Sequence, residues 1–292
     1  MSSSQPPRRR RLVGVSTKMY FTHAQTKSYI SSLKFSLSNL SPSILTALNA
    51  AAIDIFVIPD FISIIPVVEQ LAQPTPGNQS EGKEIPQIQV GAQDAYSEDK
   101  GAFTGEVSPA VLSEVGCKIV EINHAERRRL FGETDESTAA KVAAAARNGL
   151  LPLVCIGEPV KPPALTESKV GEEENLDVQT ALPQIISQIT PILAALPPET
   201  PIALAYEPVW AIGAPAPAST SYVVNIVRAI RALDCVRARP ENSVRILYGG
   251  SAGPDLFAKL VDGGNGVDGL FLGRFAHDPE AFVKAICDVA EI

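Results

Sequence analysis

Long hydrophobic runs are missing from this 292-residue sequence. No stretch approaches the roughly 18 continuous apolar residues that a membrane-spanning helix needs. The N-terminal residues 1–11 are followed by no apolar segment long enough for a signal peptide. These absences predict a protein that has no membrane partner and lies in the cytoplasm.

Cysteine is scarce, and the few cysteines are far apart in the sequence. None has the CxxC spacing that is typical of a metal or redox pair, and each lies within an apolar pattern. We therefore expect buried free thiols, no metal site and no cofactor. The four residues are Cys117, Cys155, Cys235 and Cys287.

Positive charge is not in excess. The chain has 25 Lys and Arg against 32 Asp and Glu, a net charge of −7, which argues against a nucleic-acid partner. The one basic run, Arg8–Arg11, follows the polar segment Ser2–Pro7. We expect residues 1–11 to form a solvated, disordered tail, with a nuclear or organellar targeting signal as the alternative.

The composition that remains is that of an ordinary globular protein, with 45% hydrophobic and 20% charged residues. Such a chain can bury a sizeable core. Its length exceeds that of a typical domain, yet α/β barrels of about 250 residues routinely form one domain. We expect residues 12–292 to form a single domain.

Short apolar runs rich in β-formers recur along the chain, and each is followed by a segment with helical character. This alternation predicts βα units around a parallel sheet. Gln73–Glu84 and Pro159–Asp177 are polar and rich in Pro and Gly, so we expect surface excursions there. The eight predicted strands are Leu12–Ser16, Asp54–Pro59, Ile88–Gln93, Lys118–Asn123, Leu151–Ile156, Ile202–Glu207, Arg245–Tyr248 and Asp268–Gly273.

Two arrangements suit eight βα units: a closed (β/α)8 TIM barrel and an open, doubly wound sheet. The open sheet usually has a glycine-rich turn after its first strand. Here Ser16-Thr17-Lys18 follows instead. The closed barrel is therefore the favoured fold. Helix signals support the alternation: Ser108-Pro109 predicts a capped helix start, and Gly149 ends the Ala-rich segment Asp135–Asn148.

Three polar residues lie at the carboxyl ends of predicted strands: Lys18 and His124 just past their strands, and Glu207 at the end of its own. In a barrel, the carboxyl ends of the strands meet at one mouth. A carboxylate, an imidazole and an ammonium in one pocket suit abstraction of a proton next to a carbonyl. Taken singly, each has an ordinary explanation: a structural histidine, a solvated lysine, and a glutamate that caps a turn.

Glycines follow the last two strands, in Tyr248–Ser251 and Leu272–Arg274. Glycine lets backbone N–H groups approach an anion, so these loops predict a phosphate site, with a simple tight turn as the alternative. The segment Ala205–Gly213 runs from a strand into an apolar loop that holds Trp210, the one tryptophan. That loop could close over a ligand, or Trp210 could only pack against the barrel rim.

At these positions the sequence resembles the triosephosphate isomerase family, from about Leu12 to the C-terminus. The resemblance implies a (β/α)8 barrel, no cofactor and a small phosphorylated sugar as substrate. Four segments carry it: Ala205–Gly213 resembles the family's base and lid, Gly101–Ser108 its dimer-contact loop, His124–Arg128 with Phe131–Glu133 its electrophile loop, and Tyr248–Ser251 its phosphate loop.

The resemblance also implies roles for single residues. Glu207 would be the base, His124 the neutral electrophile that polarises the carbonyl, and Lys18 the charge that stabilises an enediolate and attracts the phosphate. Glu126 would pair with Lys18, and Cys155 with Glu158 would match a structural segment. The residues implied to bind phosphate through backbone N–H groups are Gly213, Ser251, Gly273 and Arg274.

A homodimer is implied as well, because in the family the loop matched by Gly101–Glu106 crosses to the partner. Thr104 and Glu106 would lie at that contact, and Thr104 would help to position Lys18.

Several positions depart from the family pattern. Ser16 replaces an asparagine that touches the substrate, Tyr20 replaces a second asparagine, and Ala125 replaces a serine. The lid ends in Ala214–Ser219, with prolines at positions 215 and 217 where a flexible hinge is usual. Arg274 replaces a glycine and adds a cation. Ser16, the lid end and Arg274 together resemble the branch that includes erythrulose-phosphate isomerases.

The leading hypothesis is therefore a cofactor-free aldose–ketose isomerase that interconverts glyceraldehyde 3-phosphate and dihydroxyacetone phosphate. A four-carbon erythrulose phosphate is the main alternative substrate. Two further alternatives are a catalytically silent phosphate-binding paralogue and a lyase or aldolase that uses Lys18 as a Schiff base.

Overall fold

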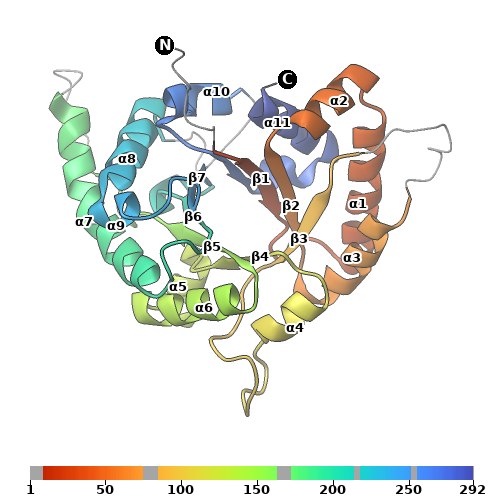
Figure 1. The fold of residues 1–292 in the computed structure, drawn as a ribbon, viewed down its shortest axis with the longest axis horizontal. Helices are drawn as coiled ribbons and strands as arrows, with labels where there is room; N and C mark the ends of the chain where they lie inside the picture. The colour runs from red at the N-terminus through yellow and green to blue at the C-terminus, as the bar shows by residue number, and fades with distance from the viewer. Residues whose placement is uncertain (1–8, 75–84, 163–171, 214–217, 251–254, 292) are drawn as a thin grey trace.

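The computed structural model describes residues 9–74, 85–162, 172–213, 218–250 and 255–291. Within them, eight parallel strands form a closed barrel in sequence order (Figure 1). The strands are β1 Arg11–Ser16, β2 Ile53–Ile58, β3 Ile88–Ala92, β4 Ile119–Ile122, β5 Leu151–Ile156, β6 Ile202–Tyr206, β7 Val244–Tyr248 and β8 Gly269–Leu272.

Closure of the barrel depends on the pairing of β1 with both β2 and β8. In the first pairing Val13 lies opposite Ile55, and in the second it lies opposite Leu270. This double pairing confirms the predicted TIM barrel and excludes the open sheet. Each predicted strand is present, and no strand end differs from its prediction by more than one residue.

Helices surround the barrel (Figure 1), and the predicted helix start at Ser108 and helix end at Gly149 are both present. The Ser108 hydroxyl accepts the Val111 N–H, and Gly149 follows its helix with a φ of 71°, where a side chain would be strained. The longer helices are α1 His23–Ser38, α2 Pro42–Ala50, α3 Ile64–Ala72, α6 Asp135–Arg147, α7 Glu172–Ala194, α8 Thr220–Ala232 and α11 Pro279–Ala290; the shorter ones are α4 Pro109–Glu114, α5 Ala125–Phe131, α9 Asp234–Arg237 and α10 Phe257–Leu260.

The core has two layers, because alternate strand residues face opposite sides of the sheet. The larger layer lies between the strands and the helices. A smaller cluster, which includes Leu12, Phe56 and Leu153, fills the barrel interior. A Cβ on Gly14 would lie 2.3 Å from the Phe56 ring, so glycine is required there to admit that ring. The interior below the mouth is therefore packed solid.

The predicted tail, residues 1–11, extends too far. Arg11 is in β1, and Arg9 and Arg10 pair with Asp268 and Asp54, each at 2.7 Å. These aspartates lie at the N-terminal ends of their strands, where no sequence pattern places them beside the arginines. Residues 1–8 lie outside the described residues.

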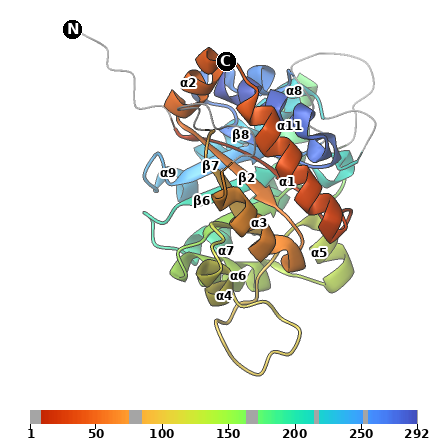
Figure 2. The ribbon, with the colours of Figure 1, turned by 90° about the vertical axis from the view of Figure 1, so that its right-hand side faces the viewer.

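The predicted surface excursions are only partly tested. α7 begins at Glu172, so the prediction of a loop over Pro159–Asp177 is wrong for its last residues. Most of Gln73–Glu84 lies outside the described residues. A different segment, between β3 and α4, extends from the body of the molecule (Figures 1 and 2).

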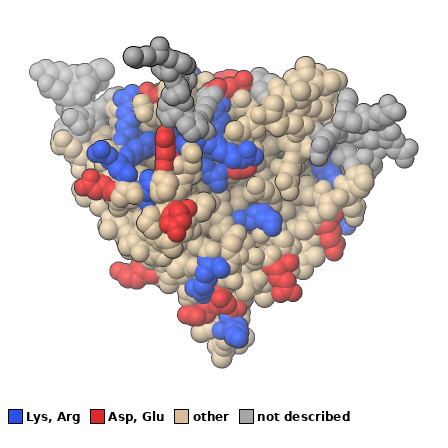
Figure 3. Space-filling model, viewed as in Figure 1, with Lys and Arg blue, Asp and Glu red and all other residues tan. Residues whose placement is uncertain are grey.

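The distribution of surface charge and the burial of the cysteines can both be compared with what the sequence predicts. Lys and Arg side chains are interspersed with Asp and Glu on the face seen in Figure 3. All four cysteines are free, but only Cys117 and Cys155 are buried, and Cys235 and Cys287 are half-buried. No helix among the described residues is long and apolar enough to cross a membrane. The cytoplasmic location stays a prediction.

Candidate active site

A cavity of about 540 Å³ opens at the carboxyl ends of the strands, and it contains most of the predicted site residues. Thr104 and Glu106 are exposed on the β3–α4 segment and do not line the cavity, and Ser251 lies outside the described residues. The predicted residues that line the cavity are Ser16, Lys18, His124, Glu126, Glu207, Gly213, Gly273 and Arg274.

Lys18 follows β1 in a left-handed conformation, with a φ of 48°. Its ammonium Nζ donates to Glu126 Oε1 at 2.9 Å and lies 3.1 Å from His124 Nε2. Burial acts to lower the pKa of Lys18, but the hydrogen bond and the charge of Glu126 outweigh burial, and the pKa is raised. The amine stays charged, which disfavours the Schiff-base alternative.

His124 is the residue that caps α5. Its Nδ1 accepts the Glu126 backbone N–H at 3.1 Å, which assigns the proton of the neutral ring to Nε2. Burial and then the charge of Lys18 lower the pKa of His124 to about 4, so the ring is neutral at physiological pH. Nε2–H and the Lys18 ammonium are two donors 3.1 Å apart, which suits one substrate oxygen that accepts from both.

Glu207 follows β6 and is only 5% exposed. Burial and then the charge of Glu121 raise its pKa to about 8. Its Oε2 has no hydrogen-bond partner among the described residues and lies 3.7 Å from His124 Nε2. A Cβ on Gly249 would lie 2.4 Å from Glu207 Oε1, so the glycine after β7 is needed to admit this side chain. A carboxyl with a raised pKa is suited to accept a proton near neutral pH.

The start of the predicted lid is tied to the barrel rim through Glu158. The Trp210 indole donates to Glu158 Oε1 at 2.7 Å, and the Tyr222 hydroxyl donates to the same atom at 2.9 Å. Tyr206 also reaches this carboxyl, at 3.2 Å. In this conformation Trp210 therefore packs against the rim, as the structural alternative predicts. Residues 214–217, with both lid prolines, lie outside the described residues.

Arg274 follows β8 on the cavity wall, and no described residue forms an ion pair with it. A Cβ on Gly213 would lie 3.6 Å from Arg274 Nη2, so the guanidinium faces the beginning of the lid. The cavity wall thus carries a cation with no ion-pair partner among the described residues, and a phosphate group would find there a donor with fixed geometry.

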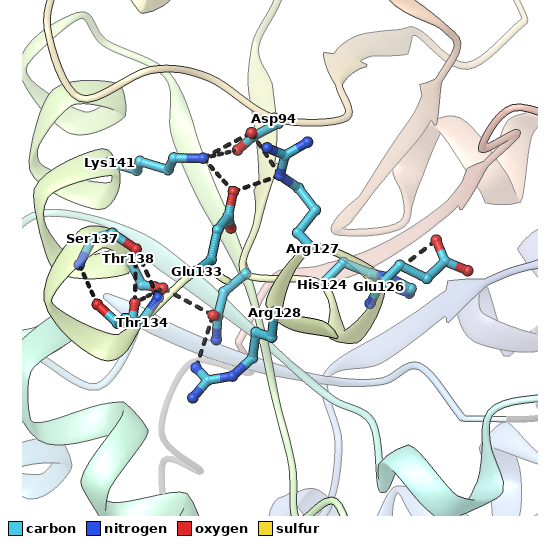
Figure 4. Close-up of polar contacts among 11 residues, drawn as sticks. Asp94, His124, Glu126, Arg127, Arg128, Glu133, Thr134, Ser137, Thr138 and Lys141 are labelled. Carbon is cyan, nitrogen blue, oxygen red and sulfur yellow. Dashed lines mark hydrogen bonds and ion pairs between the residues drawn. The ribbon is translucent and has the colours of Figure 1, made fainter. Parts of the chain in front are cut away.

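A charge network holds α5 against α6, and it was not expected from the sequence (Figure 4). Lys141 donates to Asp94 at 2.8 Å and to Glu133 at 2.6 Å. Arg127 bridges the same two carboxylates and lies next to Glu126 in α5. The network fixes α5, the helix that His124 caps, and so it fixes the ring of His124.

Glu121 in β4 is a further ionisable residue that the sequence reasoning missed. It is 3% exposed and among the strongest influences on the pKa of Glu207. A signal was available, because a glutamate inside the apolar strand Ile119–Ile122 is unusual. No group of three or more His, Cys, Asp or Glu side chains in the described part of the chain is arranged to hold a metal ion.

Comparisons with known proteins agree with the architecture. The family model described as "Triosephosphate isomerase" matches residues 11–289. An L-erythrulose-1-phosphate isomerase of Pectobacterium atrosepticum is 42% identical over 97% of this chain and 96% of its own length. A protein of the same name from Rhizobium etli is 37% identical, over 80% of this chain and 79% of its own. A triosephosphate isomerase of Aquifex aeolicus is 33% identical over 95% of this chain and 98% of its own.

Proposed function

The chain belongs to the triosephosphate isomerase family and is an isomerase, and from this premise we propose that its substrate is the four-carbon L-erythrulose 1-phosphate. The 42% identity to a relative with that name, over nearly the whole of both chains, carries the proposal. Ser16 and Arg274 support it, because both line the cavity and depart from the family pattern, whereas Lys18, His124 and Glu207 match that pattern. The three-carbon substrate favoured by the sequence is the less well supported of the two.

In the proposed reaction, a proton moves between neighbouring carbons of the sugar through an enediolate. Glu207 takes the proton from the carbon next to the carbonyl and returns it to the former carbonyl carbon, while His124 gives its Nε2 proton to the former carbonyl oxygen and takes the proton of the neighbouring hydroxyl, which becomes the new carbonyl. His124 Nε2–H and the Lys18 ammonium donate to the oxygen on which negative charge develops. The separation of 3.1 Å between these two donors is the geometric support for this step. Glu126 holds the Lys18 ammonium in place.

Phosphate binding is proposed for the part of the cavity that Arg274 lines. Gly213 and Gly273 line it and would offer backbone N–H groups, and Arg274 adds a charged donor. Ser251 is expected to contribute as well. The lid would exclude water once the phosphate is bound, which strengthens the electrostatic interactions inside.

Turnover of L-erythrulose 1-phosphate and of glyceraldehyde 3-phosphate, measured side by side on the same preparation, tests the substrate. We expect kcat/KM to be higher for the four-carbon sugar by tenfold or more, since Ser16 and Arg274, which depart from the family pattern, line the cavity that would hold the sugar. A preference for the three-carbon sugar would overturn the proposal. Absence of turnover on both would support the silent phosphate-binding paralogue instead.

A homodimer is part of the proposal. The β3–α4 segment extends from the body, and its Phe103, Thr104 and Glu106 are exposed (Figure 2). Met19 and Tyr20, next to Lys18, are 93% and 58% exposed, which is unusual for large apolar side chains near a site. A partner's loop could cover them. Light scattering at micromolar concentration should give twice the chain mass, and a monomer would count against this part of the proposal.

A further inference from the structure

Asn123 joins β4 to the histidine of the site, and its backbone lies in the left-handed region. β4 ends at Ile122, and Asn123 follows with a φ of 67°. His124 comes next and caps α5. Asparagine is one of the few non-glycine residues that tolerate this conformation, but glycine adopts it at lower cost. Glycine would therefore suffice for the backbone, and the Asn123 side chain needs a separate explanation.

The Asn123 side chain contacts three separate elements, and the residue is only 1% exposed. Its Nδ2 donates to the Cys155 carbonyl oxygen of β5 at 2.8 Å. Its Oδ1 accepts from Arg128 Nη1 of α5 at 2.9 Å and from the Thr138 hydroxyl of α6 at 2.8 Å. These partners assign the two ends of the amide, because a flipped amide would place its oxygen against the Cys155 oxygen. The amide thus ties the end of β4 to β5, α5 and α6.

The end of β5 holds Glu207 as well as Asn123. The Glu207 backbone N–H donates to the Ile156 carbonyl oxygen at 2.8 Å, one residue after the Cys155 oxygen that Asn123 binds. Asn123 and Glu207 also line one small cavity of about 20 Å³. The ends of β4 and β6 are therefore both fixed to neighbouring residues of β5. Across this connection, His124 Nε2 lies 3.7 Å from Glu207 Oε2.

The contact with Arg128 closes the turn that contains His124. Arg128 lies five residues after Asn123, in the first turns of α5, and its guanidinium returns to the Asn123 amide. Within this turn, His124 Nδ1 accepts the Glu126 backbone N–H at 3.1 Å. The ring is therefore held from both sides of the turn, and its Nε2 lies 3.1 Å from the Lys18 Nζ.

We propose that Asn123 is a positioning residue of the isomerase: its amide holds the His124 ring, with the proton on Nε2, at a fixed distance from Glu207. The kinetic part of the inference rests on the proposed function, in which both side chains exchange protons with one substrate. Asn123 is not among the described residues that line the cavity of about 540 Å³, so it acts through His124. Misplacement of a reacting group by about 1 Å costs about 10²-fold in rate.

The Asn123→Gly variant separates the amide from the backbone turn, because glycine keeps the left-handed conformation and has no side chain. We expect kcat for L-erythrulose 1-phosphate to fall about 10²-fold. The inhibition constant of inorganic phosphate should stay within about twofold of the wild-type value, because the loops proposed to bind phosphate follow β6, β7 and β8.

Two further variants refine this test. Asn123→Asp keeps the shape and the oxygen toward Arg128 but places a second acceptor against the Cys155 carbonyl, so an equal loss of kcat assigns the effect to the contact with β5 and not to lost volume. Gln70→Ala is the matched control. The Gln70 amide joins α3 to α1, donating to the Lys27 carbonyl oxygen at 2.9 Å. Its loss should lower the urea midpoint of unfolding and leave kcat unchanged.

The His124 ring reports on the amide without any sugar. The chain has 3 histidines, so the ring 15N NMR signals of His124 can be assigned by their loss in His124→Gln. A neutral ring with a fixed tautomer has one protonated and one bare nitrogen, and their signals lie far apart. In both Asn123 variants we expect the two signals to move toward each other, because a loosened ring exchanges its proton between Nδ1 and Nε2. In Gln70→Ala they should stay in place.

Two outcomes would overturn the inference. An unchanged kcat in folded Asn123→Gly, with or without a lower unfolding midpoint, would show that the amide acts on stability alone. Unchanged His124 signals in both Asn123 variants would show that the amide does not hold the ring. Should Asn123→Gly not fold, Asn123→Asp gives the same two measurements. Failure of the proposed function would appear instead as absent turnover in the wild-type protein, with His124 signals that still respond to substitution of Asn123.

Discussion

The two ends of the barrel treat their carboxylates in opposite ways. At the N-terminal end, Asp268 accepts from Arg9 at 2.7 Å, from Arg231 at 2.8 Å and from the Ile246 N–H at 2.8 Å. Glu207 at the mouth and Glu121 inside β4 are 5% and 3% exposed, and each has an oxygen without a partner in the described part of the chain.

This difference shows which end of the barrel contributes to stability and which end lowers it. Paired carboxylates at the bottom hold the first and last strands of the barrel together, and their charges are neutralised by arginine. Unpaired carboxyls at the mouth have raised pKa values and make folding less favourable, which is the usual state of groups that react. Substitutions at Glu207, Asp268 and Arg274 test this difference between the two ends of the barrel.

The largest expected effect is on turnover, from Glu207→Gln at the mouth. The amide cannot accept the proton, so kcat should fall by about 10²–10⁴-fold. KM should change little, because the shape of the cavity is kept. Steady-state kinetics on L-erythrulose 1-phosphate would measure both constants, and turnover close to that of the wild-type protein would rule out Glu207 as the base.

At the bottom, Asp268→Ala should act on stability instead. It leaves Arg231 and Arg9 without their carboxylate, and breaking a largely buried pair costs about 3–5 kcal/mol of the free energy of unfolding. Urea denaturation would measure the loss. The kcat of the folded fraction should be unchanged, and a large fall in kcat would show that the two ends are coupled.

The same Glu207→Gln variant should be more stable than the wild-type protein, in a pH-dependent way. The folded protein keeps the Glu207 proton up to a pKa of about 8, whereas an unfolded glutamate loses it near its ordinary value, so the wild-type free energy of unfolding falls as pH rises through this window. Glutamine does not titrate. The free energy of unfolding of the variant minus that of the wild-type protein should therefore be about 1–3 kcal/mol larger at pH 9 than at pH 5.

Urea denaturation at the two pH values tests this directly. Asp268→Asn provides the matched comparison from the bottom of the barrel, and it should be destabilised at both values. Equal differences between Glu207→Gln and wild type at pH 5 and pH 9 would contradict a raised Glu207 pKa.

The smallest effect is expected from Arg274→Ala. Because Arg274 is exposed on the cavity wall, the loss of its hydrogen bond to phosphate should raise KM roughly tenfold and leave kcat within a few fold. Arg274→Lys should recover only part of the affinity, since a lysine cannot donate in bidentate geometry. Competitive inhibition by inorganic phosphate should weaken by a similar factor in Arg274→Ala. An unchanged inhibition constant would place Arg274 outside the phosphate site.

Much of the site could be predicted because strand ends are readable in the sequence. Lys18, His124 and Glu207 each follow a recognisable apolar run, and a parallel barrel brings such positions to one mouth. Glu121 was missed because a residue inside a strand has no marker for the side it faces until the register is known. Trp210 was ambiguous, because its partner Glu158 is 52 residues away in the sequence.

By itself, the sequence determined the eight βα units and the residue types at their ends, since hydrophobic periodicity and glycine placement are local properties of the chain. Only the tertiary structure decided which carboxylates are paired. Arg9 reaches Asp268 across 259 positions of the sequence because β1 closes against β8, whereas Glu121 is buried with one oxygen that has no partner in the described part of the chain. Partners so distant are set by barrel closure, and no local pattern encodes them.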